Sequence, residues 1–120
     1  MEPLMTLREY AEKARAFAST WNYSVAPAWW LAYVVSKLAG EAGEVAEKFG
    51  KAIRDDQYPQ LALTPARREA MKLELGDTLW YLTATAEALG FTLEEVAEAN
   101  LAKLTDRRAR GVLHGDGDAR

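Results

Sequence analysis

The chain has 120 residues, of which 49% are hydrophobic, and its formal net charge is −3. This length allows one domain, and the hydrophobic content is typical of a folded protein. The acidic balance argues against binding to nucleic-acid backbones, because such proteins are normally basic. Cysteine is absent, which excludes disulfides, thiolate catalysis and cysteine-bound metals. A metal site would therefore depend on oxygen ligands.

The opening residues, MEPLMTLREY, lack the apolar core of a signal peptide. The longest apolar run, around VAPAWWLAYVV, is too short to span a bilayer. We therefore expect a cytoplasmic protein that has neither a membrane nor a nucleic acid as its partner.

The first predicted helix begins after Thr6, where TLRE has the form of a capping box completed by Glu9. Its apolar stripe ends at the segment STWNYS. The second predicted helix begins near Pro27, because proline is favoured in a first helical turn, and it runs to about Ile53. A loop interrupted by Pro59 follows.

The third predicted helix has Thr64 as its cap and Pro65 at its first position, and it ends at Gly90. The fourth opens with a second capping box, TLEE, at Thr92 and runs to about Arg108. Neither an alternating strand pattern nor a hairpin signal interrupts these helices.

The sequence thus predicts an all-α, four-helix domain over residues 1–111, followed by a flexible tail over residues 112–120. The tail contains the one histidine of the chain, His114. The two long central helices carry WWLAYVV and LWYL and are apolar on more than one side. Such helices are usually buried on two faces. We therefore expect oligomerisation to complete the bundle, as a homodimer or a dimer of dimers.

Two pairs of carboxylates are the strongest functional signal. Glu41 and Glu44 lie in the second predicted helix, and Glu74 and Asp77 lie in the third. The i, i+3 spacing puts each pair on one helix face. Two antiparallel helices packed through the apolar residues beside these acids would bring the four together, which is costly unless a cation neutralises them. Oxygen-only ligands suit Mg2+. A solvated surface is the alternative for either pair alone.

Glycines accompany both pairs, although each weakens a helix interior by about 1 kcal/mol relative to alanine. Gly40 and Gly43 lie beside the first pair and Gly76 lies inside the second. We interpret them as positions where a neighbouring helix or a bulky ligand approaches the backbone. A di-iron carboxylate bundle would need Glu-x-x-His motifs, which the chain lacks.

On these residues the chain resembles the MazG-like, all-α nucleoside triphosphate pyrophosphohydrolases, over about residues 31–111. The family signature, E-x-x-E followed after a variable gap by E-x-x-D, falls on Glu41, Glu44, Glu74 and Asp77. The gap is at the long end for the family. The resemblance implies cleavage of a nucleoside triphosphate into a monophosphate and pyrophosphate. It also implies that these acids hold Mg2+, with Mn2+ able to substitute.

A carboxylate outside the tightest coordination can take a proton from the attacking water. Glu44 and Glu47 are the candidates for this catalytic base, and the sequence does not separate them. Lys48, one turn past Glu44, is a candidate phosphate ligand. Its alternative role is that of a surface lysine whose stem covers apolar atoms.

Substrate recognition is expected from two further groups. Asn100, Lys103 and Arg107 follow one stripe of the fourth predicted helix, where the family carries an asparagine and a lysine that contact phosphates. A solvated basic helix end is the alternative. The nucleobase should stack on an aromatic ring, and Trp30 and Tyr81 are the best placed; packing in the core is the alternative for both.

Trp21 and Trp29 are further aromatic candidates. The substrate nucleotide is left open, with house-cleaning of the nucleotide pool as one role. Two alternatives also stay open. The first is a phosphoribosyl-ATP pyrophosphohydrolase, which shares this architecture by resemblance. The second is a non-catalytic helical interaction module whose acids are solvated or hold a structural cation.

Overall fold

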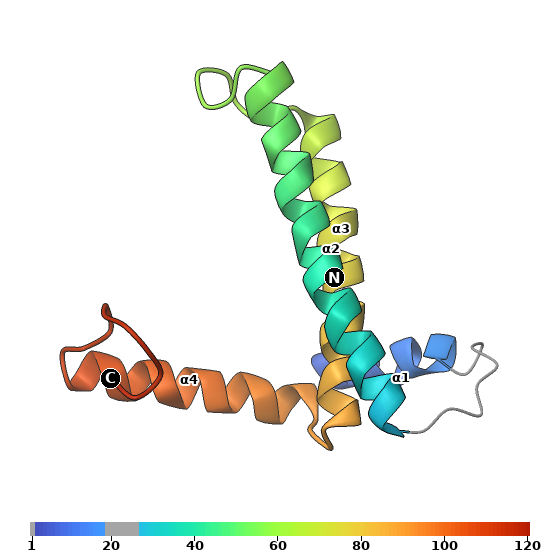
Figure 1. Ribbon diagram of the computed structural model, residues 1–120, viewed down its shortest axis with the longest axis vertical. Helices are drawn as coiled ribbons and strands as arrows, with labels where there is room; N and C mark the ends of the chain where they lie inside the picture. Colours follow the sequence, from blue (N-terminus) through green and yellow to red (C-terminus); the bar gives the residue numbers. More distant parts are fainter. Residues whose placement is uncertain (1, 19–26) are drawn as a thin grey trace.

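The structure is a computed structural model that describes residues 2–18 and 27–120, and Figure 1 shows an assembly of helices. Their bounds are α1 Leu7–Ala18, α2 Pro27–Asp55, α3 Pro65–Ala88 and α4 Leu93–Ala109. These described ranges contain no strand. The predicted all-α fold of four helices is therefore confirmed. The segment STWNYS, which was expected to end the first helix, lies outside the described residues.

Side-chain caps mark where α1, α3 and α4 begin. The Thr6 amide donates to the Glu9 carboxylate at 2.7 Å, and the Glu9 amide donates to the Thr6 hydroxyl at 3.1 Å. This reciprocal pair is the predicted capping box. Thr64 and Thr92 cap α3 and α4, each accepting a hydrogen bond at 3.1 Å from the amide three residues further on. Local signals of this kind explain why the predicted starts agree with the structure.

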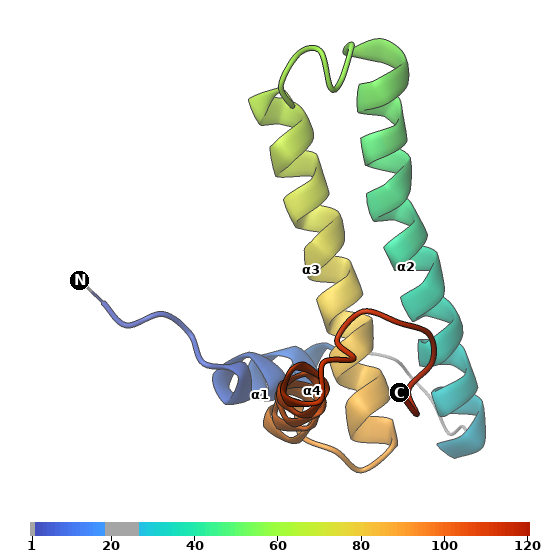
Figure 2. The same ribbon diagram turned by 90° about the vertical axis from the view of Figure 1, so that its left-hand side faces the viewer.

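The helices α2 and α3 form a long antiparallel hairpin, which we call the arm; Figure 2 shows them side by side. Two contacts close its tip. Arg67 Nε donates to Asp56 Oδ2 at 2.6 Å, and the rings of Phe49 and Tyr58 meet edge to face at 4.9 Å. These contacts fix the point at which the chain turns back between the two helices, and they therefore set the register of α3 against α2.

At the base of the arm, α1 and α4 pack against the end of α3 (Figure 1). The Trp80 indole donates to the Ala14 carbonyl at 3.2 Å, and Arg15 pairs with Glu87 at 2.8 Å. Gly90 then has a φ of +84°, a left-handed conformation that favours glycine after a helix end. The turn directs α4 away from the arm.

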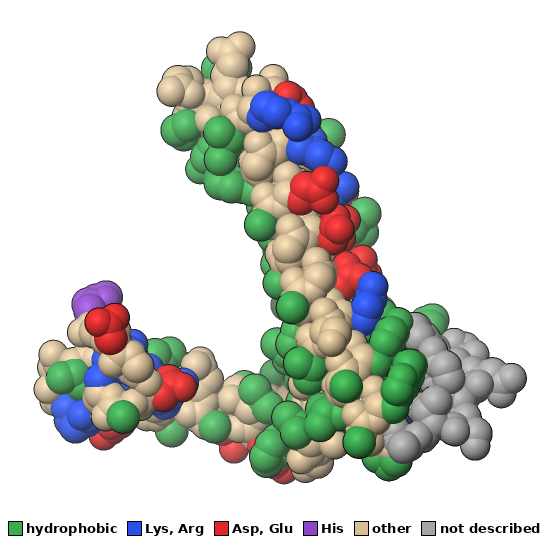
Figure 3. Space-filling model, in the orientation of Figure 1, with side chains coloured by type: hydrophobic (Ala, Val, Ile, Leu, Met, Phe, Trp, Pro, Cys, Tyr) green, Lys and Arg blue, Asp and Glu red, His purple; other side chains and the backbone are tan. Residues whose placement is uncertain are grey.

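The protomer is open. Its radius of gyration is 17.7 Å, whereas a compact chain of this length has one of about 14 Å. Within residues 2–18 and 27–120, Val34 and Leu93 are the bulkiest buried hydrophobic side chains, and the others are alanines. Figure 3 shows charged side chains along one edge of the arm and hydrophobic ones gathered around its base. No helix in the described ranges is long and apolar enough to cross a membrane.

One expectation about the packing is wrong in part. The apolar residues beside the acids were expected to join the two central helices, but three of them on α3, Leu73, Leu75 and Leu79, are 64%, 54% and 36% exposed. The reason is geometric, because successive residues of a helix project about 100° apart. Once Glu74 is directed toward α2, its two neighbours in sequence point away from that helix. The apolar sides of α3 are therefore left uncovered within the protomer.

Candidate metal centre

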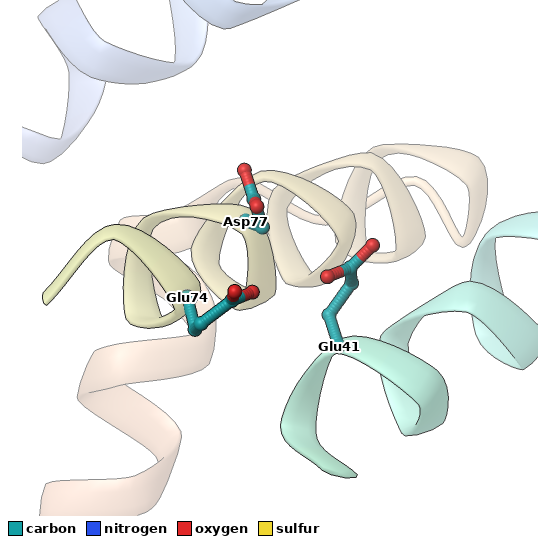
Figure 4. Close-up of side chains that lie close together, drawn as sticks. All are labelled: Glu41, Glu74 and Asp77. Carbon is teal, nitrogen blue, oxygen red and sulfur yellow. The ribbon is translucent and has the colours of Figure 1, made fainter. Parts of the chain in front are cut away.

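Three carboxylates from two helices converge partway along the arm. Figure 4 shows Glu41 on α2 reaching across to Glu74 and Asp77 on α3. One oxygen from each side chain lies within 4.8 Å of the other two. The one-turn spacing aligns Glu74 with Asp77 on α3, and the register of the hairpin places Glu41 opposite them. We call these residues the three-acid centre.

The three-acid centre fits a divalent cation. Oxygens that share one Mg2+ at 2.0–2.1 Å can be at most about 4.2 Å apart, so the observed spread needs only a small closure. The donors are all carboxylate oxygens, the ligand type that Mg2+ and Mn2+ favour. Without a positive charge between them, the three acids would repel one another.

Two lysines supply positive charge beside these acids. Lys37 Nζ lies 3.7 Å from Glu41 Oε1, and Lys48 Nζ lies 3.9 Å from Glu74 Oε1. The two carboxylate side chains are only 17% and 20% exposed, so solvent screens them incompletely. Asp77 has no ion pair within the described part of the chain. The lysines thus occupy positions next to the place where a cation would neutralise the acids.

Glu44, the fourth predicted ligand, lies outside this centre. Its carboxyl shares a hydrogen bond with Glu47, which raises the pKa of Glu44 and lowers the pKa of Glu47. Lys51 also holds Glu47, with Nζ 3.3 Å from Oε1. Proton binding is therefore easier at Glu44 than at Glu47. Both the ligand role of Glu44 and the choice of catalytic base stay predictions.

The glycines beside the acids face open space. A Cβ added to Gly40, Gly43 or Gly76 would meet no atom within 4 Å. The interpretation that a neighbouring helix approaches them is therefore wrong for the helices described in this chain. The room they leave is available to a ligand or to a second copy.

Aromatic rings gather at the end of the arm nearest α1. Tyr33 stacks on Trp29 at 5.3 Å and on Trp30 at 5.9 Å, and it meets Tyr81 edge to face at 6.4 Å. Burial, helped by a hydrogen bond with Tyr33, raises the pKa of Tyr81 to about 12. We call these four residues the aromatic cluster. The cluster contains Trp30 and Tyr81, which were predicted to stack on the nucleobase. It also contains Tyr33, which was not predicted, although its helical spacing from both tryptophans indicated that it would lie beside them. Trp21 lies outside the described residues.

The predicted phosphate ligands on α4 lie apart from the acids, because α4 leaves the base of the arm (Figure 1). Asn100 and Lys103 are exposed, whereas Arg107 is only 4% exposed. Residues 112–120 turn back over α4, and Asp118 Oδ1 accepts hydrogen bonds from Arg107 at 2.9 Å and Lys103 at 3.2 Å. Two of the three candidates thus hold a carboxylate. The flexibility of the tail stays a prediction.

Comparison with known proteins agrees with this geometry. The MazG nucleotide pyrophosphohydrolase domain matches residues 32–112. The chain belongs to this family. It is also similar to the Gene 37 protein of Mycobacterium phage L5, with 42% identity over 90 residues, which are 75% of this chain and 76% of that protein.

The part of this MazG-family chain that matches the domain begins within α2. It includes the three-acid centre, Lys48 and all of α4, but not α1 or the two tryptophans of the aromatic cluster. The acids therefore lie within the part of the chain that matches the family. The aromatic end of the arm lies partly outside it.

Asp77→Asn tests the metal centre. We expect the metal-free variant to be as stable as the wild type or slightly more stable, because the substitution removes repulsion without breaking an ion pair. Stabilisation by Mg2+ should be lost; for a bound ligand at 100 times its Kd this amounts to about 2.7 kcal/mol. Thermal melts with and without MgCl2 measure both effects. Asp116→Asn in the tail is the control. Strong destabilisation of the metal-free variant would instead make Asp77 a structural residue.

Asp118→Asn tests the contact between the tail and α4. Hydrogen bonds from Arg107 and Lys103 lower the pKa of Asp118. The contact is therefore present at pH values above the ordinary pKa range of a carboxyl group, and it is lost as the pH falls through the lowered pKa of Asp118. We expect the variant at neutral pH, and the wild type at strongly acidic pH, to show lower NMR order parameters over residues 112–120. Asp116→Asn should leave them unchanged, and equal values in all three proteins would contradict the contact.

Proposed function

We propose that this MazG-family protein hydrolyses a nucleoside triphosphate between its α and β phosphates, yielding a monophosphate and pyrophosphate, and that it serves in house-cleaning of the nucleotide pool. The observation that carries the proposal is the three-acid centre between the aromatic cluster and Lys48. A triphosphate nucleotide needs a stacking surface for its base, a cation site for its phosphates and positive charge beyond that site. These three features follow one another along α2.

In this proposal Glu41, Glu74 and Asp77 hold a divalent cation, Mg2+ or Mn2+. When bound, such an ion neutralises phosphate oxygens and acts as a Lewis acid. Lys48, only 28% exposed, would bind oxygens of the leaving pyrophosphate. The glycines on α2 and α3 leave room for the phosphates beside the acids.

A water must lose a proton as it attacks the α-phosphorus. The hydrogen-bonded Glu44–Glu47 pair lies next to the centre, and the charge of Glu74 acts on Glu44. We assign the general base to this pair, whose carboxylate oxygen takes the proton of the water. Lys51, bound to Glu47, keeps one member of the pair ionised and able to accept it.

The family assignment and the exposed surface together support an assembly of two copies or a dimer of dimers. Leucines along α3 and α4 are exposed, and an open groove of about 500 Å³ follows α4 past Asn100 and Lys103. A two-fold pairing would bury such a surface against itself. It would also offer a route for these two residues to reach the phosphates at the three-acid centre of the partner.

The activity is tested with a panel of ordinary and modified nucleoside triphosphates, together with phosphoribosyl-ATP, in the presence of Mg2+. We expect release of pyrophosphate but not orthophosphate from at least one of them. Glu47→Gln and Asp77→Asn should each reduce turnover by two orders of magnitude or more, as for loss of a general base or of the metal. Asp116→Asn is the control. If no compound is cleaved while both products are monitored, the protein is an interaction module instead.

The assembly is tested by light scattering at micromolar concentration on the active protein. We expect a mass two or four times that of the 13.3 kDa chain. Leu73→Glu and Leu101→Glu, at positions that are both 64% exposed in the protomer, should shift the mass toward the monomer, because a charge would be buried in the interface. Glu98→Gln on exposed α4 is the control. Full activity at the mass of a single chain would rule the assembly out.

A further inference from the structure

Lys37 links the two halves of the proposed site. It lies one helical turn before Glu41 on α2, with Nζ 3.7 Å from Glu41 Oε1. The same Nζ lies 5.7 Å from the centroid of the Tyr81 ring. One ammonium group therefore touches both the three-acid centre and the aromatic cluster. Its side chain is 43% exposed, so it can be reached by a ligand.

An ordinary helix ion pair does not account for this position. A pair with lysine N-terminal to glutamate at i, i+4 has the less favourable orientation, and 3.7 Å is too long for a good hydrogen bond. Partly exposed pairs of this kind contribute little to stability. The position over Tyr81 is a separate interaction of the cation with a ring face. Together the two contacts hold the ammonium at the boundary between aromatic rings and carboxylates.

The order of groups along α2 gives the direction of the substrate. Tyr33 lies about 12 Å before Glu41 along the helix axis, and Lys48 lies about 10 Å after it, at 1.5 Å per residue. A base stacked on the aromatic cluster would have its phosphates directed toward Lys48. The first phosphate to reach the acids is then the one attached to the sugar, and Lys37 is the cation at that point.

We propose that Lys37 binds the α-phosphate and thereby fixes the substrate with its nucleoside toward the aromatic cluster and its pyrophosphate toward Lys48. This inference rests on the proposed function. Glu41 would no longer need the charge of Lys37 once it held a cation, and the ammonium would then be free to bind a phosphate oxygen. Tyr81 keeps the ammonium in place during this exchange.

The test is calorimetric binding of the two products separately, in MgCl2. One probe is inorganic pyrophosphate. The other is whichever of dAMP, dGMP, dCMP, dTMP and dUMP binds the wild type most tightly. Lys37→Met should weaken monophosphate binding about ten- to hundredfold, as for loss of a charged hydrogen bond, and leave pyrophosphate binding unchanged. Lys48→Met should do the reverse.

Two variants control the experiment. Lys37→Arg keeps the positive charge and should restore most of the monophosphate affinity. Lys72→Met removes a lysine from another ion pair on a helix, in which Nζ lies 2.9 Å from Glu69 at i, i+3 and the lysine side chain is 70% exposed. This variant should change neither affinity. Circular dichroism verifies that each variant is folded.

The possible outcomes separate the two proposals. If the wild type binds both products but Lys37→Met weakens neither, or weakens both equally, the role of Lys37 is wrong while the proposed function stands. If the wild type binds no monophosphate and no pyrophosphate in MgCl2, the proposed function fails and the inference fails with it. Selective loss of monophosphate binding supports both.

Discussion

Repulsion among the carboxylates of Glu41, Glu74 and Asp77 is the constraint on which the rest of the arm depends. Two like charges 4 Å apart repel by about 4 kcal/mol at an effective dielectric constant of about 20. The hairpin nevertheless holds the three acids within 4.8 Å of one another. The contacts at its tip, Arg67 with Asp56 and Phe49 with Tyr58, oppose the separation that repulsion would favour. The site is thus built before any cation enters it, which reduces the reorganisation that binding requires.

Several parts of the fold were predictable because their signals are local. A threonine three residues before its amide partner caps a helix wherever the rest of the chain lies, so Thr6, Thr64 and Thr92 marked the helix starts correctly. The acid pairs followed from helical spacing in the same way. Convergence of Glu41 with the second pair needed one further assumption, an antiparallel hairpin, and the structure has it.

Other features depend on which of several possible contacts each side chain makes in the folded chain, and these were not predictable. The hydrogen bond that Glu44 shares with Glu47 replaces its expected approach to the other acids. The carboxylate of Asp118 returns to Arg107 from the end of the chain. Composition could not show which side of α3 would be covered, and Leu73 and Leu75 were assigned to the wrong side for that reason. Hydrophobic character predicts that a residue is buried, but not which surface buries it.

The small core of the protomer connects its stability with its function. Apart from Val34 and Leu93, the buried hydrophobic side chains of the described part of the chain are alanines. Each contributes less than a buried leucine or phenylalanine because it removes less apolar area from water. Little stability is therefore available to hold the acids together against their charge. A cation at the three-acid centre or a second copy against the exposed leucines would each bind the folded chain and stabilise it by mass action. Both would act on the same hairpin, so assembly that stiffens the arm should also raise the affinity for the metal. The coupling is reciprocal, because two ligands that favour one folded state raise each other's affinity by the same factor.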